Sequence, residues 1–254
     1  MVVKVSTIQL GGCSGCHVSL LDVGKDLFSD AITVVHSYLL MDKVTDTVES
    51  DTDVLLIEGA VLTNEDEDLL RRIAPHAKTV LAVGSCACFG GIACLGNLKN
   101  PFVTNTDNLK DSKHKLHPLV CSPKAFIDVD YYIPGCPPPA SVIGDTILAL
   151  VNGKPVPEIS HTVCDECERE KTHTAPPIAP GGKWKTTLDE APDPKKCLLE
   201  QGYLCLGRQT MGGCNASCTK ANIACEACRG PIFLFRGFKK FTDKEKKEVL
   251  KCLK

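Results

Sequence analysis

Cysteine is the residue type in this chain best suited to chemistry, and four cysteines follow apolar segments directly. The chain has 16 cysteines among 254 residues. Cys13 and Cys16 lie in the turn GGCSGC, Cys86 lies in GSCACFGG and Cys136 lies in PGCPPP. If the apolar segments are parallel strands, their carboxyl ends meet at one sheet edge, where ligands bind. Four cysteine thiolates are the usual ligands of a 4Fe–4S cluster. The alternative is a set of buried structural thiols.

Eight further cysteines follow one another in the last third of the chain. Eight thiolates can hold two four-cysteine metal sites, and both 4Fe–4S clusters and zinc ions are bound in this way. The apolar flanks Ile223–Ala224 and Gly230–Pro231 favour clusters that are shielded from water, and we therefore expect iron rather than zinc. The eight are Cys164, Cys167, Cys197, Cys205, Cys214, Cys218, Cys225 and Cys228.

The remaining four cysteines, Cys88, Cys94, Cys121 and Cys252, are expected not to be ligands. For Cys94 a role in completing a cluster stays open.

Two ionisable side chains lie close to the first cysteine set. Glu58 ends an apolar run on the same predicted sheet edge. It is a candidate for relaying protons or for hydrogen bonding at an interface, and the alternative is a turn residue. His17 directly follows Cys16, and it either hydrogen-bonds to a cluster or lies at the surface.

The first part of the chain alternates between strand and helix patterns, which is typical of a parallel sheet covered by helices. We expect a flavodoxin-like, doubly wound α/β domain over residues 1–157. A helix that Asn64 caps should carry Leu69, Leu70 and Ile73. Residues Ile92–Phe126 are polar and read as an irregular insertion. The expected strands are Val2–Leu10, Ile32–Leu40, Asp53–Val61, Thr79–Ser85 and Asp128–Ile133, and two more helices are Val18–Phe28 and Pro138–Val151.

The second part, residues 158–254, has little apolar periodicity and reads as a loop-rich domain. Hydrophobic burial alone would not fold such a segment, so metal clusters should supply its cross-links. Only the end differs. Thr242–Glu245 matches a capping box, and Arg236–Lys254 is a basic run that favours a solvated helix face over a contact with an acidic partner.

Composition excludes several classes of protein. The net charge is −2 and the pI is about 6.4, which argues against a nucleic-acid-binding protein. No apolar run reaches the roughly 20 residues that span a bilayer. No signal peptide is visible either, so we expect a cytoplasmic protein whose thiols stay reduced and bind metal.

The motifs GGCSGCHVSLLD, IEGAV, VGSCACFGG and IPGCPPP, in this order, resemble the small subunit of nickel–iron hydrogenases. The resemblance covers essentially the whole chain. It implies a proximal 4Fe–4S cluster on Cys13, Cys16, Cys86 and Cys136, facing the nickel–iron site of a separate large subunit. Glu58 would lie close by at that subunit interface. No catalytic residue is then expected in this chain, which is inactive alone.

In the second part the resemblance implies two more 4Fe–4S clusters. Many relatives have a histidine where this chain has Cys164, and many have a proline in place of one medial cysteine. The distal cluster would be bound by Cys164, Cys167, Cys197 and Cys205, and the medial cluster by Cys214, Cys218, Cys225 and Cys228. Assigning Cys218 to the medial site is the least supported step.

The resemblance also suggests a subgroup. Without a twin-arginine leader or membrane tail, the chain resembles the cytoplasmic enzymes of anaerobic methanogens. The segments CDECEREK and KCLLEQGYLCLG resemble those of enzymes that do not reduce the deazaflavin coenzyme directly. Those pass electrons from dihydrogen through a small iron–sulfur subunit to a heterodisulfide reductase complex.

Three other interpretations remain. One is the equivalent subunit of a deazaflavin-reducing hydrogenase, with a flavoprotein partner. Another, from a different class, is a structural subunit that binds zinc. The small subunit of quinone oxidoreductases is related in fold, but it would not need the eight later cysteines. The final acceptor, the reduction potentials, the direction of net electron flow and the oligomeric state are not fixed by the sequence.

Overall fold

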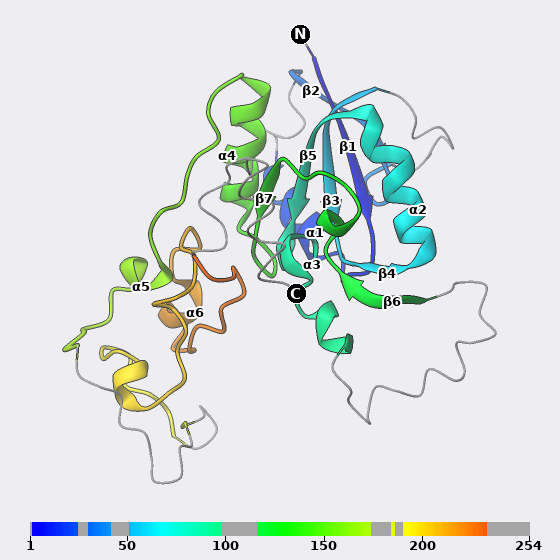
Figure 1. The fold of residues 1–254 in the computed structure, drawn as a ribbon. Coiled ribbons are helices and arrows are strands. Elements are labelled where there is room, and N and C mark those ends of the chain that lie inside the picture. The colour runs from blue at the N-terminus through cyan, green and yellow to red at the C-terminus, as the bar shows by residue number, and fades with distance from the viewer. Residues whose placement is uncertain are drawn as a thin grey trace. The chain divides into compact units, whose positions relative to one another are not determined.

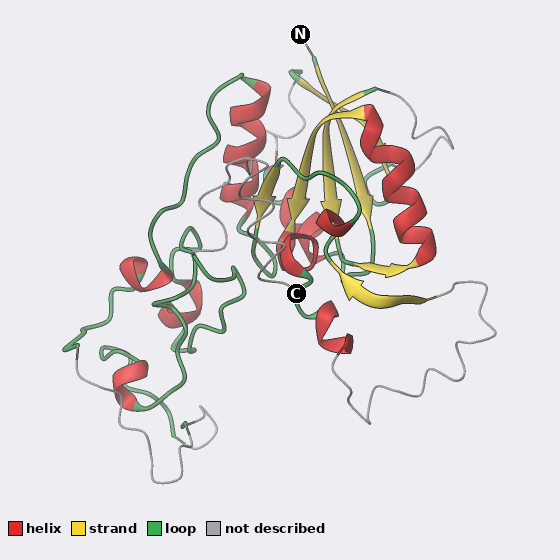
Figure 2. Ribbon diagram, in the orientation of Figure 1, coloured by secondary structure: helices red, strands yellow, loops and turns green. Residues whose placement is uncertain are grey.

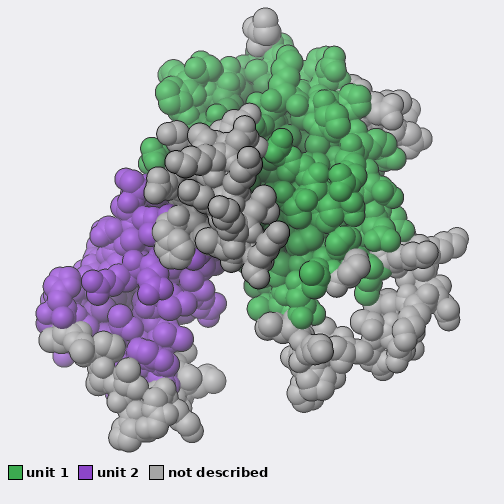
Figure 3. All heavy atoms as spheres, in the orientation of Figure 1, with its two compact units in different colours: residues 1–158, 238–254 green, residues 159–237 purple. Residues whose placement is uncertain are grey.

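The computed structural model describes residues 2–24, 30–41, 51–97, 116–173, 184–185 and 190–232. The chain divides into two compact units (Figure 3). The first unit runs to Glu158 and the second begins at Ile159.

A five-stranded, all-parallel sheet forms the centre of the first unit (Figure 1). The strand order β2-β1-β3-β5-β7 reverses between β1 and β3, which is the arrangement of flavodoxin-like sheets. The predicted doubly wound α/β fold is therefore confirmed. The strands are β1 (Val3–Gln9), β2 (Ile32–Ser37), β3 (Thr52–Glu58), β5 (Ala77–Val83) and β7 (Tyr131–Ile133).

The apolar runs form strands because both faces of the sheet are covered. Ile8, Leu55, Ile57 and Leu81 are all fully buried, as expected for central strands of a parallel sheet. The strand ends are in register: Gln9 pairs with Glu58, Glu58 with Val83, and Val83 with Ile133. The segments that follow β1, β3, β5 and β7 therefore leave the sheet at one edge.

Within the described part of the first unit, four α-helices flank this sheet (Figure 2). Thr63, rather than the predicted Asn64, caps α2, since its hydroxyl accepts from the Asp66 amide and the Asp66 carboxylate accepts from the Thr63 amide. Asn64 is the first helical residue. The helices are α1 (Gly15–Leu21), α2 (Asn64–Ile73), α3 (Gly84–Phe89) and α4 (Ala140–Val151).

The helix after β1, strand β3 and the insertion differ from what the sequence predicts. The helix expected over Val18–Phe28 begins at Gly15, before the apolar stripe, and α1 ends at Leu21. The strand expected over Asp53–Val61 ends at Glu58, because Gly59 takes a φ of 93°. The chain then forms β4 (Val61–Thr63), which pairs antiparallel with β6 (Leu116–Cys121). The insertion is thus not irregular throughout.

The second unit is rich in loops, as the sequence suggests. Its helices among the described residues are the single turns α5 (Val163–Glu166) and α6 (Ser217–Lys220), besides a 3-10 turn at Leu199–Gln201. Val163, Ala216 and Cys225 form a small buried cluster against which three more cysteines pack. Cys252, the capping-box match at 242–245 and the whole basic run Arg236–Lys254 lie outside the described residues.

None of the helices in the described ranges has the length and apolar character needed to cross a bilayer.

Candidate metal centres

The sheet edge gathers the first set of cysteines, as the strand-end argument predicts. Cys13 lies in the turn after β1 and Cys16 lies in the first turn of α1. Cys86 is in α3, directly after β5. The Ser85 amide donates to the Gly135 carbonyl at 2.8 Å, which places the turn with Cys136 beside Cys86.

Small residues make room for these thiols. Gly84 has a φ of 88°, and a Cβ added there would overlap the Sγ atom of Cys16. A Cβ on Gly15 would lie 3.3 Å from the Cys13 sulfur. The backbone therefore approaches the thiols more closely than a chain with side chains at these positions could.

The electrostatics of the edge favour a positively charged occupant. Burial strongly raises the pKa of the Cys16 thiol, and the negative charges of Glu58, Cys88, Cys13 and Cys86 raise it further. A thiolate in such surroundings needs a cation, and iron bound to several thiolates supplies that charge. Four cysteines around one edge are the donor set that a 4Fe–4S cluster takes, so the residues fit the group.

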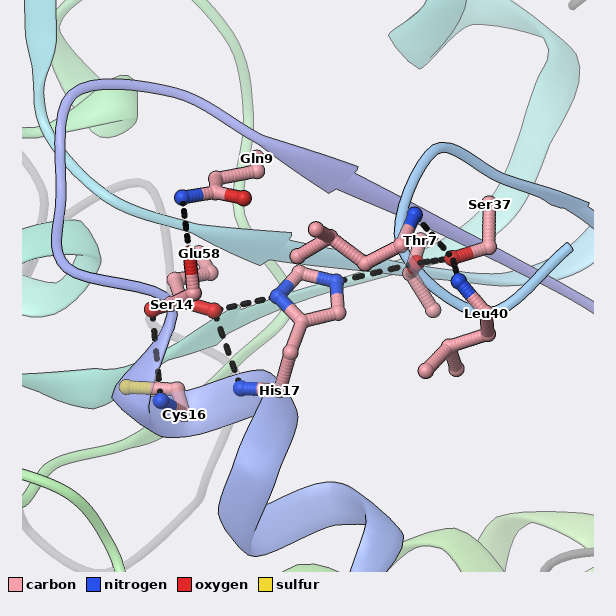
Figure 4. A network of polar contacts seen from close by, with 9 residues as sticks. Thr7, Gln9, Ser14, Cys16, His17, Ser37, Leu40 and Glu58 are labelled. Carbon is pink, nitrogen blue, oxygen red and sulfur yellow. Dashed lines mark hydrogen bonds and ion pairs between the residues drawn. The ribbon is translucent and has the colours of Figure 1, made fainter.

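Glu58 is buried behind Cys16, with 4% of its surface exposed (Figure 4). Its two carboxylate oxygens accept from the amides of Cys16 at 3.2 Å and His17 at 2.9 Å. The His17 Nδ1 atom also pairs with Glu58, and Nε2 lies 3.0 Å from the Thr7 hydroxyl. His17 is 5% exposed, so the surface alternative for this residue is wrong.

The second unit brings Cys164, Cys167, Cys197 and Cys205 together. Burial raises the pKa of Cys164, and the charges of the three other thiols raise it further against an opposing effect of Lys171. The Cys197 amide donates to the Glu170 carbonyl at 2.9 Å, which ties the second pair of cysteines to the CDEC segment.

The last four cysteines also lie near one another. Burial raises the pKa of Cys218, followed by the charges of Cys228 and Cys214. Burial likewise raises the pKa of Cys225, to which the charges of Cys205 and Cys228 add. The Cys225 amide donates to the Cys205 sulfur at 3.4 Å, so Cys205 borders both sets. Cys218 thus has Cys228 and Cys214 of its assigned set among its charged neighbours.

The other described cysteines have different surroundings. Cys88 lies in α3; its side chain is fully buried, and its thiol donates to the Ala82 carbonyl at 3.4 Å. Cys94 donates to the Val120 carbonyl at 3.0 Å, and burial and the charge of Cys86 raise its pKa. Cys121 lies at the end of β6. All fifteen described cysteines are free of disulfide bonds.

Two polar residues of the second unit, the buried Arg169 and the half-buried Glu166, are not visible as site residues in the sequence. The Arg169 guanidinium donates to carbonyls of Asp193, Lys196 and Thr219. The Glu166 carboxylate accepts from the amides of Gly213 and, at 3.0 Å, Ala216, on either side of Cys214 and Asn215. Only their position in the CDECER segment could have drawn attention to them.

Comparisons with known proteins identify the family. A family model described as "NADH ubiquinone oxidoreductase, 20 Kd subunit" matches residues 13–150. The chain is 40% identical over 244 residues to the G subunit of the F420-non-reducing hydrogenase of Methanocaldococcus jannaschii, covering 91% of this chain and 82% of the relative. It is 31% identical over 251 residues to the corresponding F420-non-reducing hydrogenase subunit of Methanothermobacter marburgensis, covering 90% and 79%.

A solved structure shares the fold. A NiFeSe hydrogenase chain of Dm. baculatum superposes with a TM-score of 0.62 at 20% identity, over 92% of this chain and 96% of that chain.

The fold and the cysteine sets define an electron-transfer subunit of the nickel–iron hydrogenase class. More narrowly, the chain belongs to the family of the G subunits, the small subunits, of F420-non-reducing hydrogenases. It is part of an oxidoreductase, and membership in this family implies a large-subunit partner.

Proposed function

We propose that this chain binds three 4Fe–4S clusters and carries electrons away from dihydrogen oxidation on the large subunit. The observation that supports the proposal most is the grouping of thiols. We assign twelve cysteines to three sets of four, one at the sheet edge and two in the second unit, and the charge effects among neighbouring thiols in each region support this assignment. The sets are Cys13, Cys16, Cys86 and Cys136 (proximal); Cys214, Cys218, Cys225 and Cys228 (medial); and Cys164, Cys167, Cys197 and Cys205 (distal).

When bound, such clusters supply one-electron redox chemistry whose potential depends on burial, charge and hydrogen bonds to sulfur. The chain's own residues provide those conditions. Gly84 lets the backbone approach the thiols at the sheet edge, and Glu58 fixes the amides next to Cys16. In the second unit Arg169 and Glu166 hold the loops that carry the cysteines.

The large subunit should cover the sheet edge that carries the proximal set. Ile92 and Leu95, in the turns after α3, expose 67% and 58% of their surfaces. Exposed apolar side chains of this size are typical of interaction sites. Glu58 would then lie behind the interface as a hydrogen-bonding group.

The acceptor that we propose is a heterodisulfide reductase complex, reached through a small iron–sulfur subunit in the cytoplasm of a methanogen. Names of the relatives support it, since they belong to enzymes that do not reduce F420. The alternative is a flavoprotein that reduces this deazaflavin coenzyme.

Anaerobic co-purification from native cells tests the proposal. A complex that contains nickel and a heterodisulfide reductase would support it. A deazaflavin-reducing flavoprotein in the complex would overturn the proposed acceptor. A chain that purifies with a subunit lacking nickel would overturn the hydrogenase role.

A further inference from the structure

A chain of buried polar side chains runs from the proximal cysteines to the far side of strand β1 (Figure 4). It begins at Glu58, passes through His17 to Thr7, and continues to Ser37, whose hydroxyl lies 2.7 Å from that of Thr7. The Ser37 hydroxyl accepts in turn from the Leu40 amide at 3.1 Å. Side chains from α1, β1, β2 and β3 therefore contribute to one continuous network.

This network lies where an apolar core would be expected. Thr7 and Ser37 pair directly in the β1–β2 ladder, and each is 1% exposed. Burying four polar side chains costs free energy unless every one of them is hydrogen-bonded. Here each one has a partner on both sides along the network. A satisfied network of this kind fixes the orientation of its members.

The end of the network is the Glu58 carboxylate, which holds the amides of Cys16 and His17. These amides are consequently bonded to Glu58 and are not free to donate to a sulfur atom. The carboxylate also places a negative charge next to Cys16. A nearby negative charge favours the oxidised, more positive state of a cluster, and hydrogen bonding to a cluster's surroundings tunes its potential.

We propose that Thr7 and Ser37 are positioning residues that act through His17 to hold Glu58, and so set the reduction potential of the proximal cluster. The inference rests on the proposed function, because it requires a cluster on Cys13, Cys16, Cys86 and Cys136. The effect of the two positioning residues travels through the hydrogen bonds from Ser37 to Glu58.

Thr7→Val tests this proposal, since it removes the hydroxyl and keeps the branched shape. His17 then loses the partner of Nε2 and no longer compensates the Glu58 charge as well. The proximal potential should fall, with the reduced-to-oxidised ratio at a fixed potential decreasing about tenfold, or about 59 mV for a one-electron couple. Thr7→Ser keeps the hydroxyl and should restore the parent potential.

The matched control is Thr146→Val. Thr146 is also 1% exposed, lies in the same unit, and donates its hydroxyl to the Val142 carbonyl within α4. Potentials are measured by anaerobic redox titration with electron paramagnetic resonance, on the complex with the large subunit. The medial and distal potentials serve as internal references.

The outcomes separate this inference from the proposed function. A proximal potential that falls in Thr7→Val, but not in Thr7→Ser or Thr146→Val, supports the network's role. An unchanged potential in Thr7→Val overturns the inference and leaves the proposed function standing. If Thr7→Val loses the proximal signal, Ser37→Ala decides, with a fall in potential supporting and no change overturning the inference. A parent complex without a proximal 4Fe–4S signal overturns the proposed function itself.

Discussion

Arg169 offers the sharpest test of how the second unit holds its cysteines. Its side chain is buried, with 8% of the residue exposed. Its guanidinium makes five hydrogen bonds of 2.5 to 3.0 Å, four to backbone carbonyls and one to Asn222. Two of the carbonyls, those of Lys196 and Thr219, directly neighbour Cys197 and Cys218 in the sequence. Arg169 thus links a loop of the distal set to a loop of the medial set.

The cost of Arg169→Met follows from these bonds. Methionine fills much of the volume but removes all five hydrogen bonds, and a hydrogen bond to a charged group contributes about 1.5 to 3 kcal/mol. The carbonyls of Asp193, Lys196 and Thr219 each keep one other donor, the Gln201 side chain or the Asn222 amide. Water can reach some of these groups, so we take about 3 to 5 kcal/mol for the whole network, as for other broken buried networks. At about 1.4 kcal/mol for each factor of ten, local opening should become about a hundred to a few thousand times more frequent.

Iron release measures this opening. When a loop recloses faster than a chelator removes iron, the rate of release follows the equilibrium for opening. We expect Arg169→Met to lose medial and distal iron at least a hundred times faster than the parent, which corresponds to about 2.8 kcal/mol at 1.4 kcal/mol for each factor of ten. The proximal signal, which belongs to the first unit, should persist.

Arg208→Met is the matched control, because Arg208 is an exposed arginine of the same unit. It should release iron at the parent rate. Arg169→Lys keeps the charge but cannot reproduce the planar set of five donors, so an intermediate rate is expected. If Arg169→Met and Arg208→Met release iron at equal rates, the reasoning from hydrogen bonds is wrong.

Two further predictions concern the first unit. Gly84→Ala should prevent assembly of the proximal cluster, because the new Cβ overlaps the Cys16 sulfur. Gly153→Ala, at a φ of 61° and with no atom within 4 Å of the new Cβ, should only destabilise the fold. The electron paramagnetic resonance signal of the proximal cluster in the two variants decides between these outcomes. His36 is 2% exposed, and burial lowers its pKa below 6.5. The unfolded chain therefore takes up a proton first as the pH falls below 6.5, and folding stability is lost on acidification. Between about pH 7 and about pH 5, the melting temperature of His36→Phe should decrease less than that of the parent. An equal decrease would contradict the prediction.

The sheet and the proximal edge could be predicted because their signals are local. Apolar runs such as the one around Leu55 and Ile57 are typical of strands buried on both faces. Once the strands are parallel, the cysteines that follow them must leave the sheet on one side. The same rule places Glu58, the last residue of β3, at this edge.

Other features depend on tertiary contacts and leave little trace in the sequence. Helix α3 is six residues long and starts at a glycine with a positive φ, so no apolar period reveals it. The β4–β6 pair joins segments more than 50 residues apart through a three-residue strand. The burial of Arg169 and His17 follows from partners on distant loops and strands. The partners of a polar side chain are set by the fold, and its own residue type does not identify them.

Acid-labile sulfide in the anaerobically purified pair of this chain and its large subunit, separated from every other iron–sulfur subunit, tests the central claim most directly, because sulfide arises from iron–sulfur clusters and not from the nickel–iron site or from zinc. Three 4Fe–4S clusters predict about twelve sulfides for each copy of this chain, with four bound per cluster. About eight sulfides would mean that one of the three cysteine sets binds no 4Fe–4S cluster. Zinc with no acid-labile sulfide would contradict it altogether.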